Sequence, residues 1–225
     1  MPHTSMTVLA LMLAGGAQAA TLDFDAASLA QLKHGSVPSP LSLDNVYYGQ
    51  SYTEEGFQLR SSLPPGPFAG AHTLYVPDAS NLRDIAAASS FAMAASAGAT
   101  ATLSKIGGGA FSLLSIDLAE LLRVGGTSRS ITFTGVKADG SPSVSESFTF
   151  TANWQTFAFN SSFANLSSVR WTQSSNATRS LQFDNIKVSA VPEPAVCAML
   201  MAGLGLLALA YAQSLRAPAV SRWVR

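Results

Sequence analysis

The chain has 225 residues, only 12% of them are charged, and its formal net charge at pH 7 is zero. A nucleic-acid-binding surface needs clustered lysine and arginine, so this charge balance argues against nucleic acid as a partner. The chain has a single cysteine, Cys197, so no intramolecular disulfide can form and the fold depends on its core.

The N-terminus has the pattern of an export signal. An apolar run covers residues 6–14, and Ala17 and Ala19 follow with the small-x-small spacing that signal peptidase cleaves. No lysine or arginine precedes the run, and a buried N-terminal strand or helix is the alternative. We predict a signal peptide over residues 1–19, handled by the general secretion machinery, and an exported domain over residues 20–190.

The first half of this domain gives weak strand signals. Short candidate strands lie at residues 21–25, 56–61 and 74–76. Segments 99–103 and 110–118 flank Gly107–Gly109 and have the pattern of a hairpin. Residues 84–97 are rich in alanine and serine, for which we favour a loop over a helix, and residues 117–122 are compatible with a helical turn.

The second half reads as strands almost throughout. Apolar and polar residues alternate with period two at residues 130–135, 145–151, 155–159, 166–172 and 181–188. Turn-forming residues such as Asp139 and Gly140 separate these segments. Strands at intervals of roughly 8–12 residues predict an all-β fold, an antiparallel β-sandwich or barrel.

The C-terminal segment, residues 191–225, has the pattern of a membrane anchor. It divides into a proline motif at 191–194, an uncharged apolar run at 195–212 and a basic tail at 213–225. A transmembrane helix takes roughly 17–25 mostly apolar residues, so the run predicts one short crossing of the inner membrane. Arginines after the run place the tail on the cytoplasmic side and the domain outside.

The motif within that segment is Pro192, Glu193 and Pro194, with Arg216 as the nearest basic flank. Together with the short apolar helix, it resembles the PEP-CTERM sorting signal of Gram-negative bacteria. The resemblance implies that exosortase recognises the tail in the inner membrane. It also implies a protein of the cell surface or extracellular matrix, associated with extracellular polysaccharide. The alternative is a plain single-span anchor.

The domain itself resembles the jelly-roll sandwiches of carbohydrate-binding modules and galactose-binding-like domains. The segments that carry this resemblance are 111–118, 131–135 with Asp139 and Gly140, 154–157 and 183–186. The resemblance implies a jelly-roll-like antiparallel β-sandwich that contacts sugars. A sandwich fold does not by itself fix a function.

Catalytic motifs are missing from the sequence. His34 and His72 have no metal-spaced partner, and no Gly-x-Ser-x-Gly elbow occurs. We therefore expect a non-enzymatic protein. The alternative is an exported polysaccharide hydrolase, which needs two carboxyl groups about 5–10 Å apart. Candidate acids for such a pair are Glu54, Glu55, Glu120 and Glu146.

A structural calcium site is the sharpest chemical prediction, because calcium takes six to eight oxygen ligands from carboxylates, amides and carbonyls. Asp23 and Asp25 lie on the predicted first strand, and Asp184 and Asn185 on the last. First and last strands of jelly rolls often lie close together. The alternative is that these acids are ordinary surface residues.

Sugar binding needs exposed aromatic side chains with hydrogen-bonding groups beside them. Tyr47, Tyr48 and Tyr52 fall in one predicted loop, and Trp171 lies in the 166–172 strand. We predict these four as ligand-binding residues. The alternative for Tyr52 is a place in the core.

Overall fold

The computed structural model describes residues 19–24, 28–37, 43–65, 73–76, 92–121, 128–175, 181–190, 201–209 and 211–212. The chain forms two compact units, one over Gln18–Val191 and one over Met1–Ala17 with Pro192–Arg225. The sorting motif at 191–194 and Arg216 lie outside the described residues, as does the predicted signal peptide up to residue 18.

The first unit is built from strands. The strands are β1 (Ala19–Leu22), β2 (Lys33–Val37), β3 (Leu43–Gly49), β4 (Ser51–Glu54), β5 (Phe57–Ser62), β6 (Leu74–Val76), β7 (Met93–Ala95), β8 (Thr100–Lys105), β9 (Phe111–Glu120), β10 (Arg129–Lys137), β11 (Val144–Phe150), β12 (Gln155–Ala158), β13 (Leu166–Thr172) and β14 (Leu181–Ala190). Two short 3₁₀ helices, η1 (Ser28–Gln31) and η2 (Ser161–Phe163), complete it. The predicted all-β fold is confirmed.

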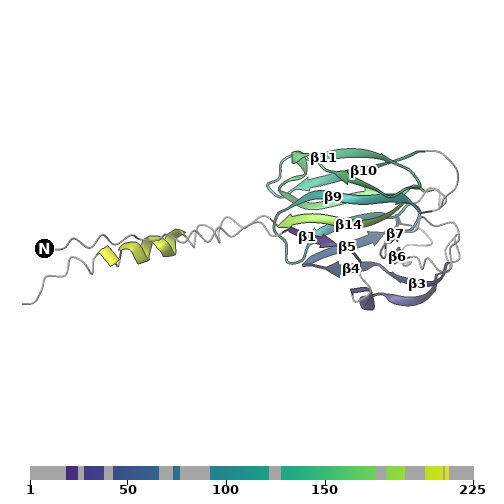
Figure 1. The fold of residues 1–225 in the computed structure, drawn as a ribbon, viewed down its shortest axis with the longest axis horizontal. Helices are drawn as coiled ribbons and strands as arrows, with labels where there is room; N and C mark the ends of the chain where they lie inside the picture. Colours follow the sequence, from purple (N-terminus) through teal and green to yellow (C-terminus); the bar gives the residue numbers. More distant parts are fainter. Residues whose placement is uncertain are drawn as a thin grey trace, which may run out of the picture. The chain divides into compact units, whose positions relative to one another are not determined.

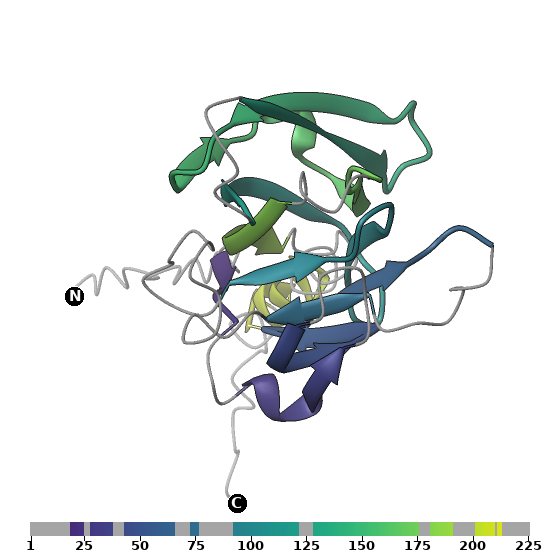
Figure 2. The same cartoon turned by 90° about the vertical axis from the view of Figure 1, so that its right-hand side faces the viewer.

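The strands pair antiparallel and divide into two layers. A first sheet runs β2-β3-β6-β7-β14-β9, with β12 on β9 and β1 beside β14 (Figure 1). A second sheet runs β4-β5-β8-β13-β10-β11. The two are joined by the bridge between Leu166 and Phe111. Figure 2 shows the β10–β11 hairpin and the β2–β4 strands on opposite sides of the domain.

The core lies between the two sheets. Phe183 of β14 meets Trp171 of β13 with ring centroids 5.2 Å apart, and Phe111 of β9 meets Phe57 of β5 at 5.3 Å. Each pair joins one sheet to the other. Fully burying one large apolar side chain contributes roughly 1.5–3 kcal/mol, so these aromatic side chains dominate the packing.

Two loop predictions are wrong in part. Residues 47–52 lie in β3 and β4 rather than in a loop, with a break only at Gln50. An added Cβ at Gly49 would lie 2.8 Å from a methyl of Leu32, the residue after η1, so a side chain at this position requires the Leu32 side chain to shift. In the segment 84–97, Met93–Ala95 forms β7 because β6 and β14 pair with it.

Two further predictions fail for tertiary reasons. Residues 99–103 and 110–118 form strands but no hairpin, since β8 pairs with β5 and β13 while β9 pairs with β14 and β12. Positive φ angles at all three glycines of Gly107–Gly109 turn the chain from one sheet to the other. The predicted helical turn at 117–122 is strand up to Glu120, because cross-strand pairing outweighs local helix preference.

The second unit contains helix at residues 201–209 and 211–212, inside the predicted 195–212 run. Its large apolar side chains are exposed, namely Met201, Leu204, Leu206, Leu207, Leu209 and Tyr211. Within the described residues, no helix has both the length and the apolar character of a membrane span. The transmembrane helix therefore stays a prediction, and residues 195–200 lie outside the described part of the chain.

Candidate functional site

The outer face of the second sheet carries an unusual set of side chains. Residues on this face alternate with buried ones such as Leu59, Phe133 and Trp171. They are Ser51 and Thr53 of β4, Gln58, Arg60 and Ser62 of β5, Thr100, Thr102 and Ser104 of β8, Ser168, Arg170 and Thr172 of β13, Ser130, Thr132, Thr134 and Val136 of β10, and Ser145, Ser147 and Thr149 of β11. All but four are serine or threonine, and we name this surface the hydroxyl face.

Hydroxyl groups on this face pair across the strands. The pairs are Ser130–Thr149 at 3.0 Å, Thr132–Ser147 at 2.7 Å, Thr134–Ser145 at 3.2 Å and Thr100–Thr172 at 2.9 Å. A hydroxyl offers one donor and two acceptor positions, so each paired group can still bond to a ligand. The cross-strand pairs fix the directions in which those remaining positions point.

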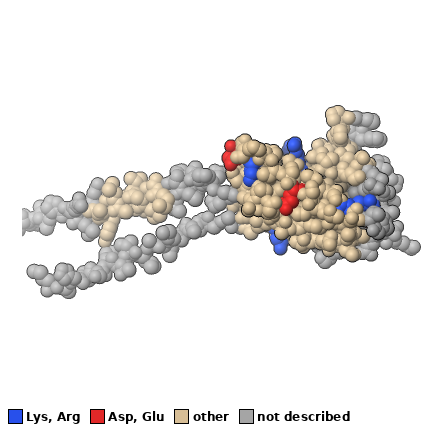
Figure 3. All heavy atoms as spheres, turned by 90° about the horizontal axis from the view of Figure 1, so that it is seen from above, with Lys and Arg blue, Asp and Glu red and all other residues tan. Residues whose placement is uncertain are grey.

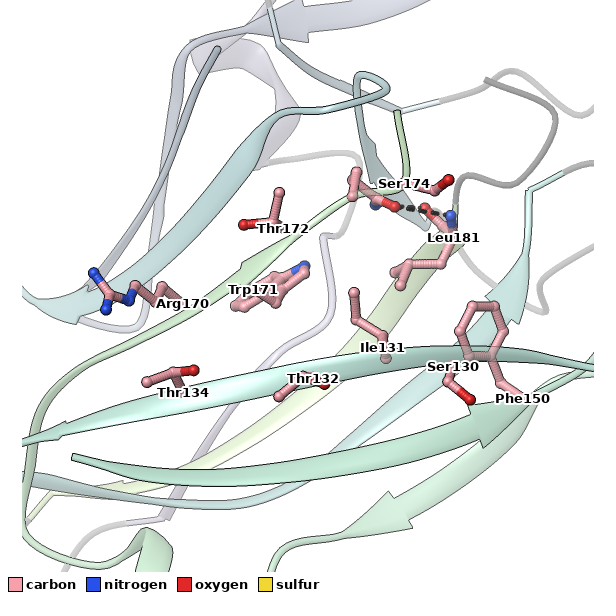
Figure 4. A pocket seen from close by; sticks show the side chains of 11 residues that line it. Ser130, Ile131, Thr132, Thr134, Phe150, Arg170, Trp171, Thr172, Ser174 and Leu181 are labelled. Atoms are coloured by element: carbon pink, nitrogen blue, oxygen red, sulfur yellow. Dashed lines mark hydrogen bonds between the residues drawn. The ribbon is translucent and has the colours of Figure 1, made fainter. Parts of the chain in front are cut away.

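A hollow of about 430 Å³ opens at one end of the hydroxyl face, where β10 and β13 separate. Their pairing extends from Lys137–Leu166 only as far as Phe133–Trp171. Beyond that point the strands leave a pocket, shown in Figure 4. Polar groups on its lining are Ser130, Thr132, Thr134, Arg170, Thr172, Gln173 and Ser174; the apolar ones are Ile131, Phe150, Trp171 and Leu181.

Two hydrogen bonds hold the far end of the pocket. The buried Gln173 side chain donates to the Leu181 carbonyl at 3.0 Å and accepts from the Leu181 amide at 3.1 Å (Figure 4). Gln173 follows β13 and Leu181 begins β14, so the amide ties the two sheets together there. At this end of the pocket, Gln173 is therefore held in place by its hydrogen bonds to the Leu181 backbone.

Trp171 supplies a donor without a protein partner. Its side chain is only 2% exposed, and its ring packs on Phe133 and Phe183 with centroids 5.2 Å away in each case. Within the described residues, no acceptor lies within hydrogen-bonding reach of its indole nitrogen. An unmade buried hydrogen bond costs about 1–3 kcal/mol. Figure 4 shows that nitrogen on the side of Ile131 and Leu181.

The predicted tyrosines do not join Trp171. Tyr52 is fully buried and packs on Phe24 with centroids 5.2 Å apart, so its prediction as an exposed sugar-binding ring is wrong. Tyr47 and Tyr48 are half-buried on β3, in the first sheet, and being consecutive they face opposite sides. Tyr47 lies against His34, with centroids 4.8 Å apart.

The predicted calcium ligands are brought together only in part. β1 pairs with β14, as expected for first and last strands, and Leu22 lies opposite Ile186. Asp184 is buried and accepts from the Asn185 amide at 2.7 Å. The Asn185 side chain donates to Asp117 at 2.9 Å, an acid that the sequence analysis missed because β9 was not matched to β14.

Asp23 lies instead near Glu54 at the end of β4. The amide of Phe24 donates to the Glu54 carboxylate at 3.2 Å. Burial raises the pKa of Glu54 above its ordinary value, the Phe24 hydrogen bond opposes this, and the charge of Asp23 adds to it. In the described part of the chain, no group of three or more His, Cys, Asp or Glu is arranged to hold a metal, and Asp25 lies outside that part.

The glutamates considered for hydrolysis have other surroundings. Glu120 is buried beside Arg129, with Oε1 and Nε 3.2 Å apart. Glu146 accepts a hydrogen bond from the Asn160 amide at 3.2 Å. No carboxylate is among the described residues that line the pocket. Figure 3 shows one side of the molecule, on which charged side chains are few and scattered.

The tail gives a direct match to a known family. Residues 190–216 match the model of the PEP-CTERM protein-sorting motif. The chain carries a PEP-CTERM motif. The matched range includes Pro192, Glu193, Pro194 and Arg216, so the resemblance predicted for these residues is confirmed. The PEP-CTERM motif indicates an exported protein that is sorted to the cell surface. It covers the tail and leaves the sandwich unassigned.

Comparison of the fold with solved structures finds carbohydrate-binding modules. A family 29 module has 9% identity and a TM-score of 0.34, with 77% of this chain and 89% of that one covered. The xylan-binding CBM22-1 domain of Paenibacillus barcinonensis Xyn10C has 10% identity and a TM-score of 0.37, with 78% and 96% covered. With TM-scores this low, the ligands of those modules are no guide to the ligand of this chain. Among curated proteins, none matches this chain.

Proposed function

We propose that this protein is a non-enzymatic component of the extracellular matrix whose sandwich domain binds polysaccharide through the pocket between β10 and β13. The observation that carries the binding proposal is the make-up of that pocket. It combines an apolar floor, formed around Trp171 and Ile131, with a rim of hydroxyl groups. Sites for small organic ligands are commonly apolar with a few well-placed polar groups.

The chemistry of the rim suits a sugar. Sugar hydroxyls both donate and accept hydrogen bonds, and so do the side chains of Ser130, Thr132 and Thr172 on the rim. A carboxylate pair, which a glycoside hydrolase uses, has no counterpart among the described lining residues. Binding is therefore better supported than hydrolysis.

The PEP-CTERM motif supports the route by which the domain reaches its ligand. In this proposal the secretion machinery exports the chain and signal peptidase removes residues 1–19. The 195–212 helix then holds an intermediate in the inner membrane of a Gram-negative cell, with the domain outside. Exosortase processes the tail at Pro192, Glu193 and Pro194, and the domain joins the cell surface or matrix.

The binding proposal is tested by filling the pocket. Thr132 is exposed on the rim, and Thr132→Tyr places a ring there while keeping a residue that strands tolerate. Ser147→Tyr is the matched control, because Ser147 lies opposite Thr132 on β11 but does not line the pocket. Full-length wild type and both variants, in nonionic detergent, are screened against a polysaccharide array that includes xylan, mannan and polygalacturonate.

We expect wild type and Ser147→Tyr to bind the same polysaccharides, and Thr132→Tyr to bind them at least about tenfold more weakly, which corresponds to about 1.4 kcal/mol. If wild type binds none of them, or if both variants bind like wild type, the proposal is wrong.

Calcium binding remains a separate proposal, and its test uses the same full-length protein in nonionic detergent. If Asp23, Asp25, Asp184 and Asn185 hold a calcium ion, EDTA lowers the melting temperature, because a ligand that binds only the folded state stabilises it. An identical melting curve with EDTA and with added calcium removes calcium from the account.

A further inference from the structure

The hydroxyl face contains one line of residues that crosses the whole second sheet. Each member lies directly opposite the next on the neighbouring strand. From β11 to β4 the line is Ser145, Thr134, Arg170, Thr102, Arg60 and Ser51. Thr134 and Arg170 also line the pocket, so the line passes the pocket on its way from β11 to β4.

Two guanidinium groups stand on this line with one threonine between them. Arg60 on β5 and Arg170 on β13 are both opposite Thr102 on β8. Neighbouring strands lie 4.7–4.9 Å apart, so the two arginine Cα atoms are about 10 Å apart, the scale of a disaccharide. Both arginines are exposed, and Figure 4 shows the Arg170 side chain directed away from Trp171.

Nothing on the described part of this face neutralises the two charges. The residues of the hydroxyl face include no aspartate or glutamate. The ion pair found among the described residues joins Arg129 to Glu120, away from this face. The described lysines lie elsewhere; Lys137, for example, donates to the backbone carbonyls of Ser162 and Ala164. Apart from Arg60 and Arg170, the described residues of the hydroxyl face are therefore uncharged, and these two positive charges have a fixed spacing.

We propose that the polysaccharide bound here is an acidic one, a polymer of uronic acids, and that Arg60 and Arg170 each bind a carboxylate while Thr102 and its neighbours bind ring hydroxyls. This inference rests on the proposed function. A guanidinium matches a carboxylate with two parallel hydrogen bonds, which is how proteins commonly recognise planar acids. Because the two sites lie on one rigid sheet, a polymer that engages one carboxylate presents the next at high effective concentration.

Nucleic acid is the other long anion with regular charges, and the face suits it poorly. Sequence-tolerant binding of single strands uses aromatic rings on which bases stack, together with a groove lined by many cations. The described residues of the hydroxyl face include no aromatic side chain and only these two cations. A hydroxyl-rich polymer with spaced carboxylates fits the same pattern better.

The test compares two forms of one polymer. Polygalacturonate is used as the probe, and the same polymer with its carboxyl groups reduced to alcohols is the neutral form. Binding of the full-length chain in nonionic detergent is measured for wild type, Arg60→Gln, Arg170→Gln and Lys187→Gln. Lys187 is exposed on β14 of the first sheet, so its variant removes one positive charge outside the hydroxyl face. Melting curves verify that each variant is folded, and single-stranded DNA is included as a competitor anion.

We expect wild type to bind polygalacturonate at least tenfold more tightly than the reduced polymer. Each arginine variant should lose about tenfold, equivalent to about 1.4 kcal/mol, and Lys187→Gln should match wild type. Added salt should weaken the wild-type interaction, because exposed charges are screened.

Equal binding of the two polymers, or binding of the neutral form alone, overturns the acidic-polymer inference and leaves the proposed function intact. Failure to bind either polymer, or any polysaccharide on the array, overturns both. Tighter, arginine-dependent binding of DNA would overturn the inference in favour of nucleic acid.

Discussion

The PEP-CTERM tail and the sandwich domain encode their functions in different ways. The tail's motif is contiguous, since Pro192, Glu193 and Pro194 are neighbours and the family match ends at Arg216. The hydroxyl face is assembled from strands that lie far apart in the chain, and Arg60 and Arg170 come to lie on either side of Thr102 only through strand pairing. A short peptide can be recognised without a fold, whereas a spaced pair of charges needs a rigid sheet.

This difference separates what a substitution can do in each region. In the proposed sorting route, a change in the tail alters recognition by exosortase, and it leaves the core intact because the tail lies outside the unit Gln18–Val191. A change in the sandwich acts through packing, cross-strand pairing or burial, and its size depends on how deeply the side chain is buried. The three predictions below test that separation, from the largest expected effect to the smallest.

The largest effect is expected from Glu193→Ala. The variant should fold normally but remain in the membrane fraction with its tail attached, because in the proposed sorting route exosortase recognises the charge of Glu193 between the two prolines. The measurement is the ratio of membrane to released protein, compared with Glu193→Asp, which keeps the charge, and with a strain that lacks exosortase. Equal release in all of these would mean that the tail is a plain anchor removed by general proteolysis.

Phe133→Ala should destabilise the sandwich by about 3–5 kcal/mol, because it removes a fully buried ring and leaves a cavity between the sheets. Chemical denaturation of the full-length chain measures the loss. Val136→Ala on the same strand faces the other way and is half-exposed, so it should cost much less. Similar losses in the two variants would show that the inner and outer faces of β10 are wrongly assigned.

The smallest effect is expected from Glu54→Gln. The pKa of Glu54 is raised in the folded state, chiefly by burial, so its ionisation opposes folding. That penalty is absent below the ordinary pKa of 4.5 and grows as the pH rises through the folded-state pKa. Glutamine stays neutral and can still accept the hydrogen bond from Phe24. Because Glu54 is only half-buried, solvent screening limits the gain at pH 7 to less than about 1 kcal/mol.

Melting temperatures at pH 4 and pH 7 measure this effect, with Glu55→Gln at the exposed neighbouring position as control. The difference between Glu54→Gln and wild type should appear at pH 7 and vanish at pH 4. A gain of the same size at both pH values would assign the effect to packing rather than to charge.

The sequence alone determined the class of the fold and the nature of the tail. Alternation in segments such as 130–135 and 166–172 identified β10 and β13 because side chains on a strand face two sides in turn. The PEP-CTERM motif could be identified from the sequence because its residues are contiguous. The link between the first and last strands was also expected, and β1 does pair with β14.

Only the tertiary structure decided which strands are neighbours and which side of each is buried. The sequence predicts a loop at Tyr52, and only the pairing of β4 and the packing against Phe24 show that this residue lies on a strand and points into the core. Likewise, Arg60 and Arg170 are unremarkable in the sequence, since their common line depends on β8 lying between their strands. Local preferences fix the period of a strand, whereas register and neighbours depend on contacts between distant segments, and those contacts assemble the candidate site.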